Sequence, residues 1–191
     1  MRVVAGQAKG LPLKAVPGKT TRPTTDKVKE SIFNMIGPFF DGGTAVDLFA
    51  GSGGLGIEAL SRGIEHAVFT DKDKKAIDTI QANLQKTKME DQAQVYRADA
   101  ERALKAMKKN GVSARLLFLD PPYHMEKAYG LMERAAEIGL LEEGAIVVCE
   151  HDRDIELPDE TEHCIRFKKE LYGNTVISIY RYQGEEGERI D

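Results

Sequence analysis

The feature that most constrains the fold is a regular alternation of short, apolar, β-prone runs with longer segments of helical spacing. Strands are predicted at 45–49, 67–70, 94–97, 116–119 and 145–149, and helices between them at 54–62, 74–86, 100–109 and 126–138. A strand reached through a helical crossover lies parallel to the strand before it, and the helices then cover both faces of the sheet. The alternation predicts one α/β domain, which the length of 191 residues can accommodate.

The two ends of the chain depart from this alternation. Near the C-terminus, β-rich runs at 164–171 and 176–182 flank Tyr172-Gly173-Asn174-Thr175 and predict an antiparallel hairpin. At the N-terminus, runs at 1–5 and 11–16 predict a small β-hairpin arm. Thr24 or Thr25 is then expected to cap a helix that buries Val28, Ile32 and Ile36.

The N-terminal segment is basic within an acidic chain. The net charge is −4 overall, but residues 1–29 carry seven Lys or Arg side chains against one Asp, which gives +6 there and −10 in the remainder. Any phosphate-binding surface should therefore centre on this segment, the alternative being an ordinary solvated face.

Targeting and cysteine signals are sparse. Without a signal-peptide core or a membrane-spanning run, we expect a cytoplasmic protein that binds no membrane. Cys149 and Cys164 lie in apolar runs without metal-ligand spacing, so we expect buried, reduced thiols and no metal.

A glycine-rich turn between the first predicted strand and helix indicates a nucleotide-type cofactor. Gly51, Gly53 and Gly56 satisfy G-x-G-x-x-G, a spacing that permits a tight turn and a close approach of ligand to backbone. Asp71 ends the second strand, where a carboxylate can accept both hydroxyl hydrogens of an adenosine ribose. Taken alone, the turn could be purely structural, and Asp71 could cap the following helix.

Acidic residues around this turn favour S-adenosylmethionine over a dinucleotide. Asp47 precedes the first glycine by four residues, where it would repel a pyrophosphate but suit a sulfonium and an ammonium. Asp99 is placed to accept from an adenine amino group, or to cap the helix from Ala100, and the stem of Lys72 could cover the adenine face. The expected cofactor-binding residues are Asp47, Phe49, Ala50, Gly51, Gly53, Asp71, Lys72, Asp99 and Ala100.

Asp120-Pro121-Pro122-Tyr123, directly after a buried strand, is the most specific chemical motif. The prolines fix φ and remove two backbone donors, so the turn is rigid and displays carbonyl oxygens. Asp120 and the Pro121 carbonyl could accept both N–H groups of an exocyclic amine, localising its lone pair for attack on a sulfonium methyl. Tyr123 could stack on the base, and whether His124 contributes is open.

With these motifs, the chain resembles the RsmD family of bacterial methyltransferases. The resemblance covers nearly the whole length. It rests on Arg2-Val3-Val4-Ala5-Gly6, on residues 22–30, on Phe33-Asn34, on residues 47–62 including Glu58-Ala59-Leu60-Ser61-Arg62, and on residues 120–123.

The resemblance implies methylation of the N2 amino group of a guanine in 16S ribosomal RNA, in a small subunit or an assembly intermediate. It also implies a Rossmann-like class I methyltransferase fold, for which fold analogy gives a mostly parallel seven-stranded sheet in the order 3-2-1-4-5-7-6. We accordingly divide the chain into an arm and loop (1–23), a methyltransferase domain (24–183) and an acidic tail (184–191), and expect a monomer.

The basic segment then becomes the expected RNA contact, with Arg22 and Lys27 holding phosphate, Asn34 near the base, and Thr24 among the substrate-binding residues. Its helix is also expected to pack through its apolar face. Because a paired base hides its amino group, the target guanine must lie in a loop or be extruded.

Other functions remain open at this stage. The same site could methylate adenine N6 in nucleic acid or a protein glutamine amide, although glutamine-modifying relatives usually have Asn at the position of Asp120. An RNA-binding module without catalysis and an NAD-dependent oxidoreductase are further alternatives, but the latter would need a hydride-transfer constellation that the sequence lacks.

Overall fold

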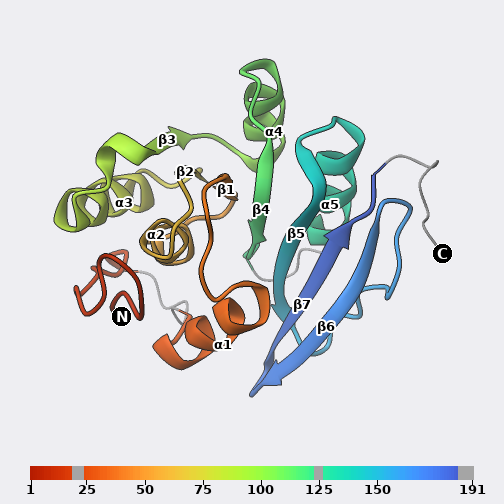
Figure 1. Ribbon diagram of the computed structural model, residues 1–191, viewed down its shortest axis with the longest axis horizontal. Helices are drawn as coiled ribbons and strands as arrows, with labels where there is room; N and C mark the ends of the chain where they lie inside the picture. The colour runs from red at the N-terminus through yellow and green to blue at the C-terminus, as the bar shows by residue number, and fades with distance from the viewer. Residues whose placement is uncertain (19–23, 123–126, 185–191) are drawn as a thin grey trace.

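The computed structural model of the protein, which describes residues 1–18, 24–122 and 127–184, has a seven-stranded sheet in the order β3-β2-β1-β4-β5-β7-β6 (Figure 1). The strands β1 to β5 pair in parallel, and β7 runs antiparallel to both β5 and β6. The elements are α1 (Asp26–Ile36), β1 (Thr44–Asp47), α2 (Gly54–Ser61), β2 (His66–Asp71), α3 (Lys74–Thr87), η1 (Glu90–Gln92), β3 (Ala93–Arg97), α4 (Ala100–Lys109), β4 (Ala114–Leu119), α5 (Lys127–Glu137), β5 (Leu141–Asp152), β6 (Cys164–Tyr172) and β7 (Thr175–Tyr182). The predicted strand order and terminal hairpin are confirmed.

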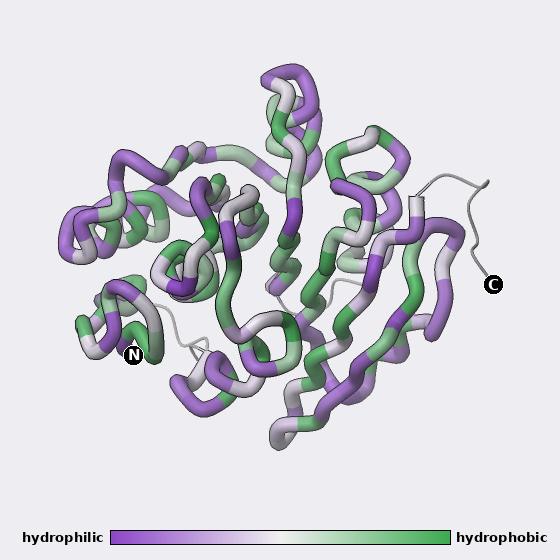
Figure 2. The backbone as a smooth tube through the Cα atoms, viewed as in Figure 1, coloured by the Kyte–Doolittle hydropathy of each residue, from purple (hydrophilic) through white to green (hydrophobic). Residues whose placement is uncertain are grey.

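Two apolar clusters, one on each face of the sheet, form the core. One cluster joins the sheet to α1, α2 and α3 through side chains such as Phe33, Ile57 and Ile80. The other joins it to α4 and α5 through side chains such as Leu104 and Met132. Figure 2 shows hydrophobic stretches in the middle of the molecule and hydrophilic turns outside. Both faces are thus covered, as a largely parallel sheet requires.

Helix α1 begins at the predicted cap. The Thr25 hydroxyl accepts from the Val28 N–H at 3.3 Å, which satisfies one of the free donors of the first turn. Ile32, Phe33 and Ile36 are buried, while Lys27 and Asn34 are exposed. One face of α1 therefore packs and another faces solvent, as the sequence predicts.

The predicted N-terminal hairpin is not confirmed. Among residues 1–18, antiparallel pairing is limited to one bridge between Arg2 and Pro12. The Val3 and Leu13 N–H groups close this bridge by donating to the Leu11 and Met1 carbonyls at 2.9 Å each. The pairing does not extend, because the Leu11 N–H turns back to the Ala8 carbonyl and the Val4 and Ala5 N–H groups donate to the Glu58 carboxylate of α2, at 3.0 and 3.1 Å. The arm is a bridged loop held by the domain.

A buried network of charged groups holds this arm. The Lys29 Nζ, on a fully buried side chain, donates to the Arg2 carbonyl at 2.6 Å and lies 3.7 Å from a Glu58 oxygen. Arg62 Nε donates to the other Glu58 oxygen at 3.1 Å. Burial lowers the pKa of Lys29 despite the Glu58 and Asp26 charges nearby. Lys29 is therefore a structural ion and not, as the count of N-terminal charges assumed, available to phosphate.

The arm and α2 also touch through their backbones at Gly6. The Ser61 hydroxyl donates to the Ala5 carbonyl at 2.6 Å, and the Gln7 N–H donates to the Ser61 carbonyl at 2.8 Å. A Cβ on Gly6, whose φ is +85°, would lie 1.8 Å from the Ser61 oxygen. Only glycine fits this contact.

Three smaller findings complete the fold. Strand β5 is longer than the predicted 145–149. Its first residue, Leu141, pairs with Ala114 of β4, and the pairing continues from Leu116 and Ile146 after a shift of register. Cys149 and Cys164 are buried free thiols, as expected, and burial raises the pKa of each to about 12. Among the described residues, no helix is long and apolar enough to cross a membrane.

Candidate active site

The glycine turn after β1 leaves open space where a ligand could approach. Gly51 and Gly53 adopt φ values of 56° and 84°, and a Cβ on Gly51 would meet no protein atom within 4 Å. At Gly56, by contrast, a Cβ would lie 2.3 Å from the Phe69 ring, so this glycine permits close packing of α2 against β2. The first glycines thus shape the turn, and the third seats the helix.

Asp71 is fixed beside this turn by two backbone donors. Its Oδ2 accepts from the Gly51 N–H at 3.0 Å, and its Oδ1 accepts from the Asp73 N–H at 2.9 Å. A carboxylate held in this way at a strand end can accept from vicinal hydroxyls without rearranging. The geometry of Asp71 suits its predicted contact with ribose.

Asp47, at the end of β1, has a buried carboxyl that would favour a cationic neighbour. It is 3 % exposed, and its Oδ2 accepts from the Gly56 N–H at 3.2 Å. Burial, together with the Asp71 and Glu150 charges, raises the pKa of Asp47 to about 7 against 3.8 ordinarily. A ligand bearing positive charge would stabilise the ionised form.

The Asp120-Pro121-Pro122 segment begins where β4 ends, next to the end of β1. Burial and the neighbouring Glu150 and Asp47 carboxyls raise the pKa of Asp120 well above its usual value. Glu150 of β5 is hydrogen-bonded to Asp120, and it also accepts from the Thr24 hydroxyl at 3.1 Å. Tyr123 and His124 lie outside the described residues.

Sequence reasoning missed Glu150. It follows the predicted strand 145–149 directly, and the parallel register that pairs Leu119 with Cys149 sets it beside Asp120. The signal was available, because a carboxylate just after a buried parallel strand lies at the edge where α/β proteins bind ligands.

The remaining predicted cofactor residues lie around the same edge. Asp99 caps α4, its Oδ1 accepting from the Arg102 N–H at 2.9 Å, which is the structural alternative considered for it. Lys72 is exposed, and its carbonyl accepts from Arg97 Nε at 3.1 Å. Ala50 is buried, whereas Phe49 and Ala100 are half-buried.

Among the predicted substrate-binding residues, Thr24 contacts the acidic site formed by Asp47, Asp120 and Glu150, through its hydrogen bond to Glu150. Lys27 and Asn34 lie exposed on α1, and Arg22 falls outside the described residues. The structure thus brings together the glycine turn, Asp47, Asp71 and Asp120, with Thr24 beside them through Glu150.

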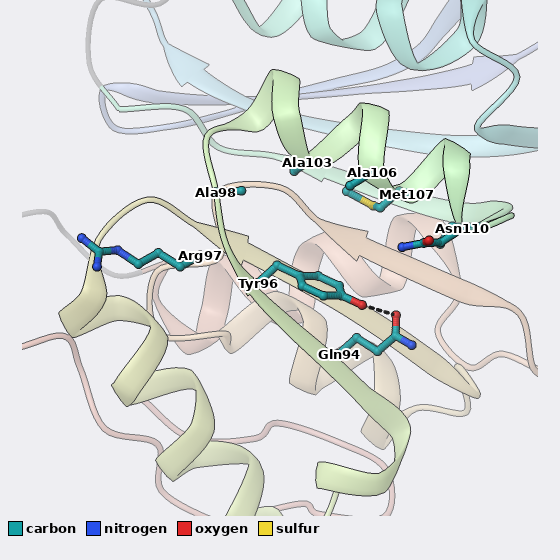
Figure 3. Close-up of a pocket in the computed structure, with 9 residues that line it drawn as sticks. Gln94, Tyr96, Arg97, Ala98, Ala103, Ala106, Met107 and Asn110 are labelled. Atoms are coloured by element: carbon teal, nitrogen blue, oxygen red, sulfur yellow. Dashed lines mark hydrogen bonds between the residues drawn. The ribbon is translucent and has the colours of Figure 1, made fainter.

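A separate cavity of about 190 Å³ lies between β3 and α4 (Figure 3). Its walls include Tyr96, whose hydroxyl donates to Gln94 Oε1 at 3.2 Å, and Met107. None of the buried carboxylates lines it, so this cavity is not the acidic site.

A second polar group joins α5 to the loop before β6. The side-chain atoms of Glu133, Glu162 and His163 that could coordinate a metal ion lie within 4.8 Å of one another. The spacing of histidines in the sequence did not predict this group. His163 Nδ1 and Glu133 Oε2 are 2.8 Å apart, and this hydrogen bond raises the pKa of His163. Because a second Glu133 oxygen is bonded to Thr161, both carboxylate oxygens already have protein partners.

Comparison with known proteins gives consistent relatives. The family model described as "Conserved hypothetical protein 95" matches residues 1–181. The Bacillus subtilis protein named "Putative rRNA methyltransferase YlbH" is 56% identical over 184 residues, which cover 96% of this chain and all of that protein. Ribosomal RNA small subunit methyltransferase D of Haemophilus influenzae is 34% identical, with 81% of this chain and 80% of that one covered.

The solved structure named "Putative methyltransferase yhhF from Escherichia coli" has the same architecture. It superposes with a TM-score of 0.84 at 27% identity, covering 97% of this chain and 99% of that one.

Proposed function

The chain belongs to the family of ribosomal RNA small subunit methyltransferase D, and we propose that it methylates ribosomal RNA with S-adenosylmethionine as the methyl donor. The target in this proposal is the N2 amino group of a guanine in 16S ribosomal RNA of the small subunit or of an assembly intermediate. The observation that carries it is the meeting of the glycine turn, Asp71 and Asp120 around one acidic site at the carboxyl ends of adjacent parallel strands.

The residues present fit this cofactor. Asp47 is buried, Asp120 and Glu150 are half-buried, and desolvation raises the pKa of all three, with the Glu150 charge raising that of the other two further. A positively charged ligand is therefore favoured there. Asp71 offers oxygens to the ribose, and the open space over Gly51 admits a ligand against the backbone. When bound, S-adenosylmethionine supplies an activated methyl group on a cationic sulfur.

The Asp120 segment is suited to hold the amine that receives this methyl. Two acceptors, the Asp120 carboxyl and the Pro121 carbonyl, are matched to the two N–H groups of an exocyclic amine, and hydrogen bonds to both concentrate its lone pair on nitrogen. The two prolines keep the acceptors in one orientation. We expect Tyr123 to stack on the base and Arg22, Lys27 and Asn34 to contact the RNA.

Other residues support the cofactor in this proposal. Lys72 and Asp99 flank the expected position of adenine, while Phe49, Ala50, Gly53 and Ala100 shape the surrounding surface. The protein is expected to act as a cytoplasmic monomer without a metal.

The direct test is methyl transfer to small subunits from a strain that lacks the gene. Labelled S-adenosylmethionine should deliver one methyl per particle to 16S ribosomal RNA, and mass spectrometry of nuclease fragments should find N2-methylguanine. Asp120→Ala should lower turnover at least about a hundredfold, and Asp71→Ala should weaken cofactor binding at least about tenfold. Asp91→Ala, at an exposed position in η1, serves as the control.

Three outcomes would overturn the proposal. Label in N6-methyladenine or in a glutamine side chain would assign the same chemistry to another amine. Full turnover by Asp120→Ala would remove the amine-holding role. Binding of NAD in preference to S-adenosylmethionine would overturn the cofactor.

A further inference from the structure

Glu150 lies beside Asp120, the carboxyl proposed to bind the amine. The strands β4 and β5 are parallel neighbours with Leu119 opposite Cys149, so the next residues, Asp120 and Glu150, leave the sheet together. Their side chains share a hydrogen bond. Because burial raises the pKa of both carboxyls, and the Glu150 charge raises that of Asp120 further, the pair is expected to share one proton and carry one negative charge.

The groups around the pair supply no positive charge. The Asp47 charge of β1 raises the pKa of Asp120, and the Glu150 and Asp71 charges raise that of Asp47. His151, next to Glu150 on β5, is turned to Ser178, whose hydroxyl lies 2.9 Å from its Nε2. Among the described residues, the pair is therefore surrounded by acidic or neutral groups, and burial raises the pKa of both of its members.

A third group fixes Glu150 from the far end of the chain. The Thr24 hydroxyl donates to Glu150 Oε2 at 3.1 Å across 126 positions of sequence. Thr24 directly precedes Thr25, the cap of α1, so the start of this helix and the Asp120 turn are joined through one carboxylate. In this hydrogen bond the Thr24 hydroxyl donates its own hydrogen to Glu150. The proton that Glu150 shares with Asp120 is therefore not used by Thr24.

We propose that Glu150 is a positioning residue for methyl transfer, one that orients Asp120 and shares with it the proton released by the methylated amine. The inference rests on the proposed function, since it takes an exocyclic amine as the group bound by Asp120.

The proton balance of the reaction requires such an acceptor. The amine nitrogen uses its lone pair to form the new N–C bond, and the electrons of the broken S–C bond remain on sulfur. The nitrogen then has one proton too many and a positive charge. That proton passes to the Asp120–Glu150 pair, which changes from one proton to two and from a charge of −1 to neutral. The second proton leaves to water after the products.

The experiment compares Glu150→Gln with a matched control, Glu170→Gln. Both residues pair with Ile177 of β7 and so lie in one row of the sheet, but Glu170 is exposed on the outer strand β6. Turnover, the KM for S-adenosylmethionine and the dependence of kcat on pH are measured with small subunits. In parallel, the carboxyl titration of Asp120 is followed by NMR in the ligand-free protein.

Glutamine keeps the shape and a hydrogen bond but cannot hold the negative charge. Glu150→Gln should therefore lower kcat at least about tenfold, with a smaller rise in the KM for S-adenosylmethionine because one of the charges that favour the cationic cofactor is gone. The titration of Asp120 and the acidic limb of the kcat profile should both move down by about one pH unit, because the neighbouring anion is gone. Glu170→Gln should change none of these. A merely structural role for Glu150 would alter stability without moving either titration.

Thr24 gives an independent check. Thr24→Val removes the hydroxyl at nearly constant volume and should lower kcat in the same direction by a smaller factor, whereas Thr24→Ser should restore it. An unchanged Asp120 titration and an unchanged kcat profile in Glu150→Gln would overturn the inference. Absence of methyl transfer to RNA by the unaltered protein would refute the proposed function, and the ligand-free titration would still decide whether Glu150 holds Asp120.

Discussion

Replacing Asp47 by Asn should stabilise the ligand-free protein at alkaline pH while weakening cofactor binding. The carboxyl is 3 % exposed, and burial with nearby acidic groups raises its pKa from 3.8 to about 7. Because each pH unit of such a difference corresponds to about 1.4 kcal/mol, ionised Asp47 lowers the free energy of unfolding by about 4 kcal/mol above pH 7. Asparagine cannot ionise, and its oxygen can still accept from the Gly56 N–H.

The sign follows from the raised pKa in the folded state. The contribution of this group to stability is fully present below its unfolded pKa, near 3.8, and is lost as the pH rises through about 7. Burying the amide of Asn costs about 1–3 kcal/mol, so the net gain at pH 8 should be about 1–3 kcal/mol. For a chain of this size, that corresponds to a rise in Tm of roughly 3–10 °C. At pH 5 the advantage should be smaller by about 2–3 kcal/mol.

Urea denaturation of Asp47→Asn and the unaltered protein at pH 5 and pH 8 measures these differences, and calorimetry measures cofactor binding at the same pH values. Asp41→Asn is the control, since Asp41 is exposed and the Arg115 guanidinium lowers its pKa, so this change should not stabilise at either pH. Affinity of the unaltered protein for S-adenosylmethionine should rise from pH 6 to pH 8 as Asp47 ionises, and Asp47→Asn should lose at least about tenfold at pH 8. A stability gain that is absent or equal at both pH values would refute the electrostatic reasoning, and undiminished binding would refute the role of Asp47.

Three further outcomes are expected. Gly6→Ala should lower the free energy of unfolding by at least about 2 kcal/mol more than Gly10→Ala in chemical denaturation, because both glycines have positive φ but only at Gly6 would the Cβ strike the Ser61 carbonyl; equal losses would exclude the clash. His163→Gln should lower Tm more at pH 6 than at pH 9, since the raised pKa of His163 means that its stabilising contribution is present below about 6.5 and lost as the pH rises past the folded value; a difference that does not depend on pH would contradict this. Lys27→Ala should weaken binding to ribosomal RNA and reduce the slope of log affinity against log salt by about 1 without changing cofactor affinity, and an unchanged slope would place Lys27 outside the phosphate contacts.

The sheet could be predicted closely because each strand and helix had a local cause in the sequence. Apolar runs of strand length and helical segments with period near 3.6 gave the elements, and the crossovers dictated parallel pairing. Strand β5 was predicted too short because Glu142, Glu143 and Gly144 interrupt its apolar run, and it continues through them only because β4 pairs with both of its parts. The pairing of β5 with β4 depends on residues far apart in the sequence, so no local pattern predicts it.

The site was predicted in part for the same reason. The glycine turn, Asp71 and Asp120 could be predicted from their positions directly after strands, and the structure sets both Asp71 and Asp120 within electrostatic reach of Asp47. Glu150 carried only the weaker signal of a carboxylate directly after a predicted strand, and its place beside Asp120 comes from the register of β5 against β4. Lys29 was misjudged because charge counting cannot tell a solvated lysine from one that lies buried against Glu58.

Glu58 links segments of this chain that lie far apart in the sequence. Its oxygens accept from Val4, Ala5 and Arg62 and lie near Lys29, so this one carboxylate joins the arm, α1 and the helix that follows the glycine turn. Replacing one partner would leave buried charge uncompensated, which is far more destabilising than losing an exposed ion pair. The same helix α1 begins beside Thr24, which bonds Glu150 at the acidic site. The segment expected to bind RNA and the helix that follows the glycine turn are thus joined by contacts through Glu58, α1 and Thr24, so we expect a shift of the arm to displace Glu150.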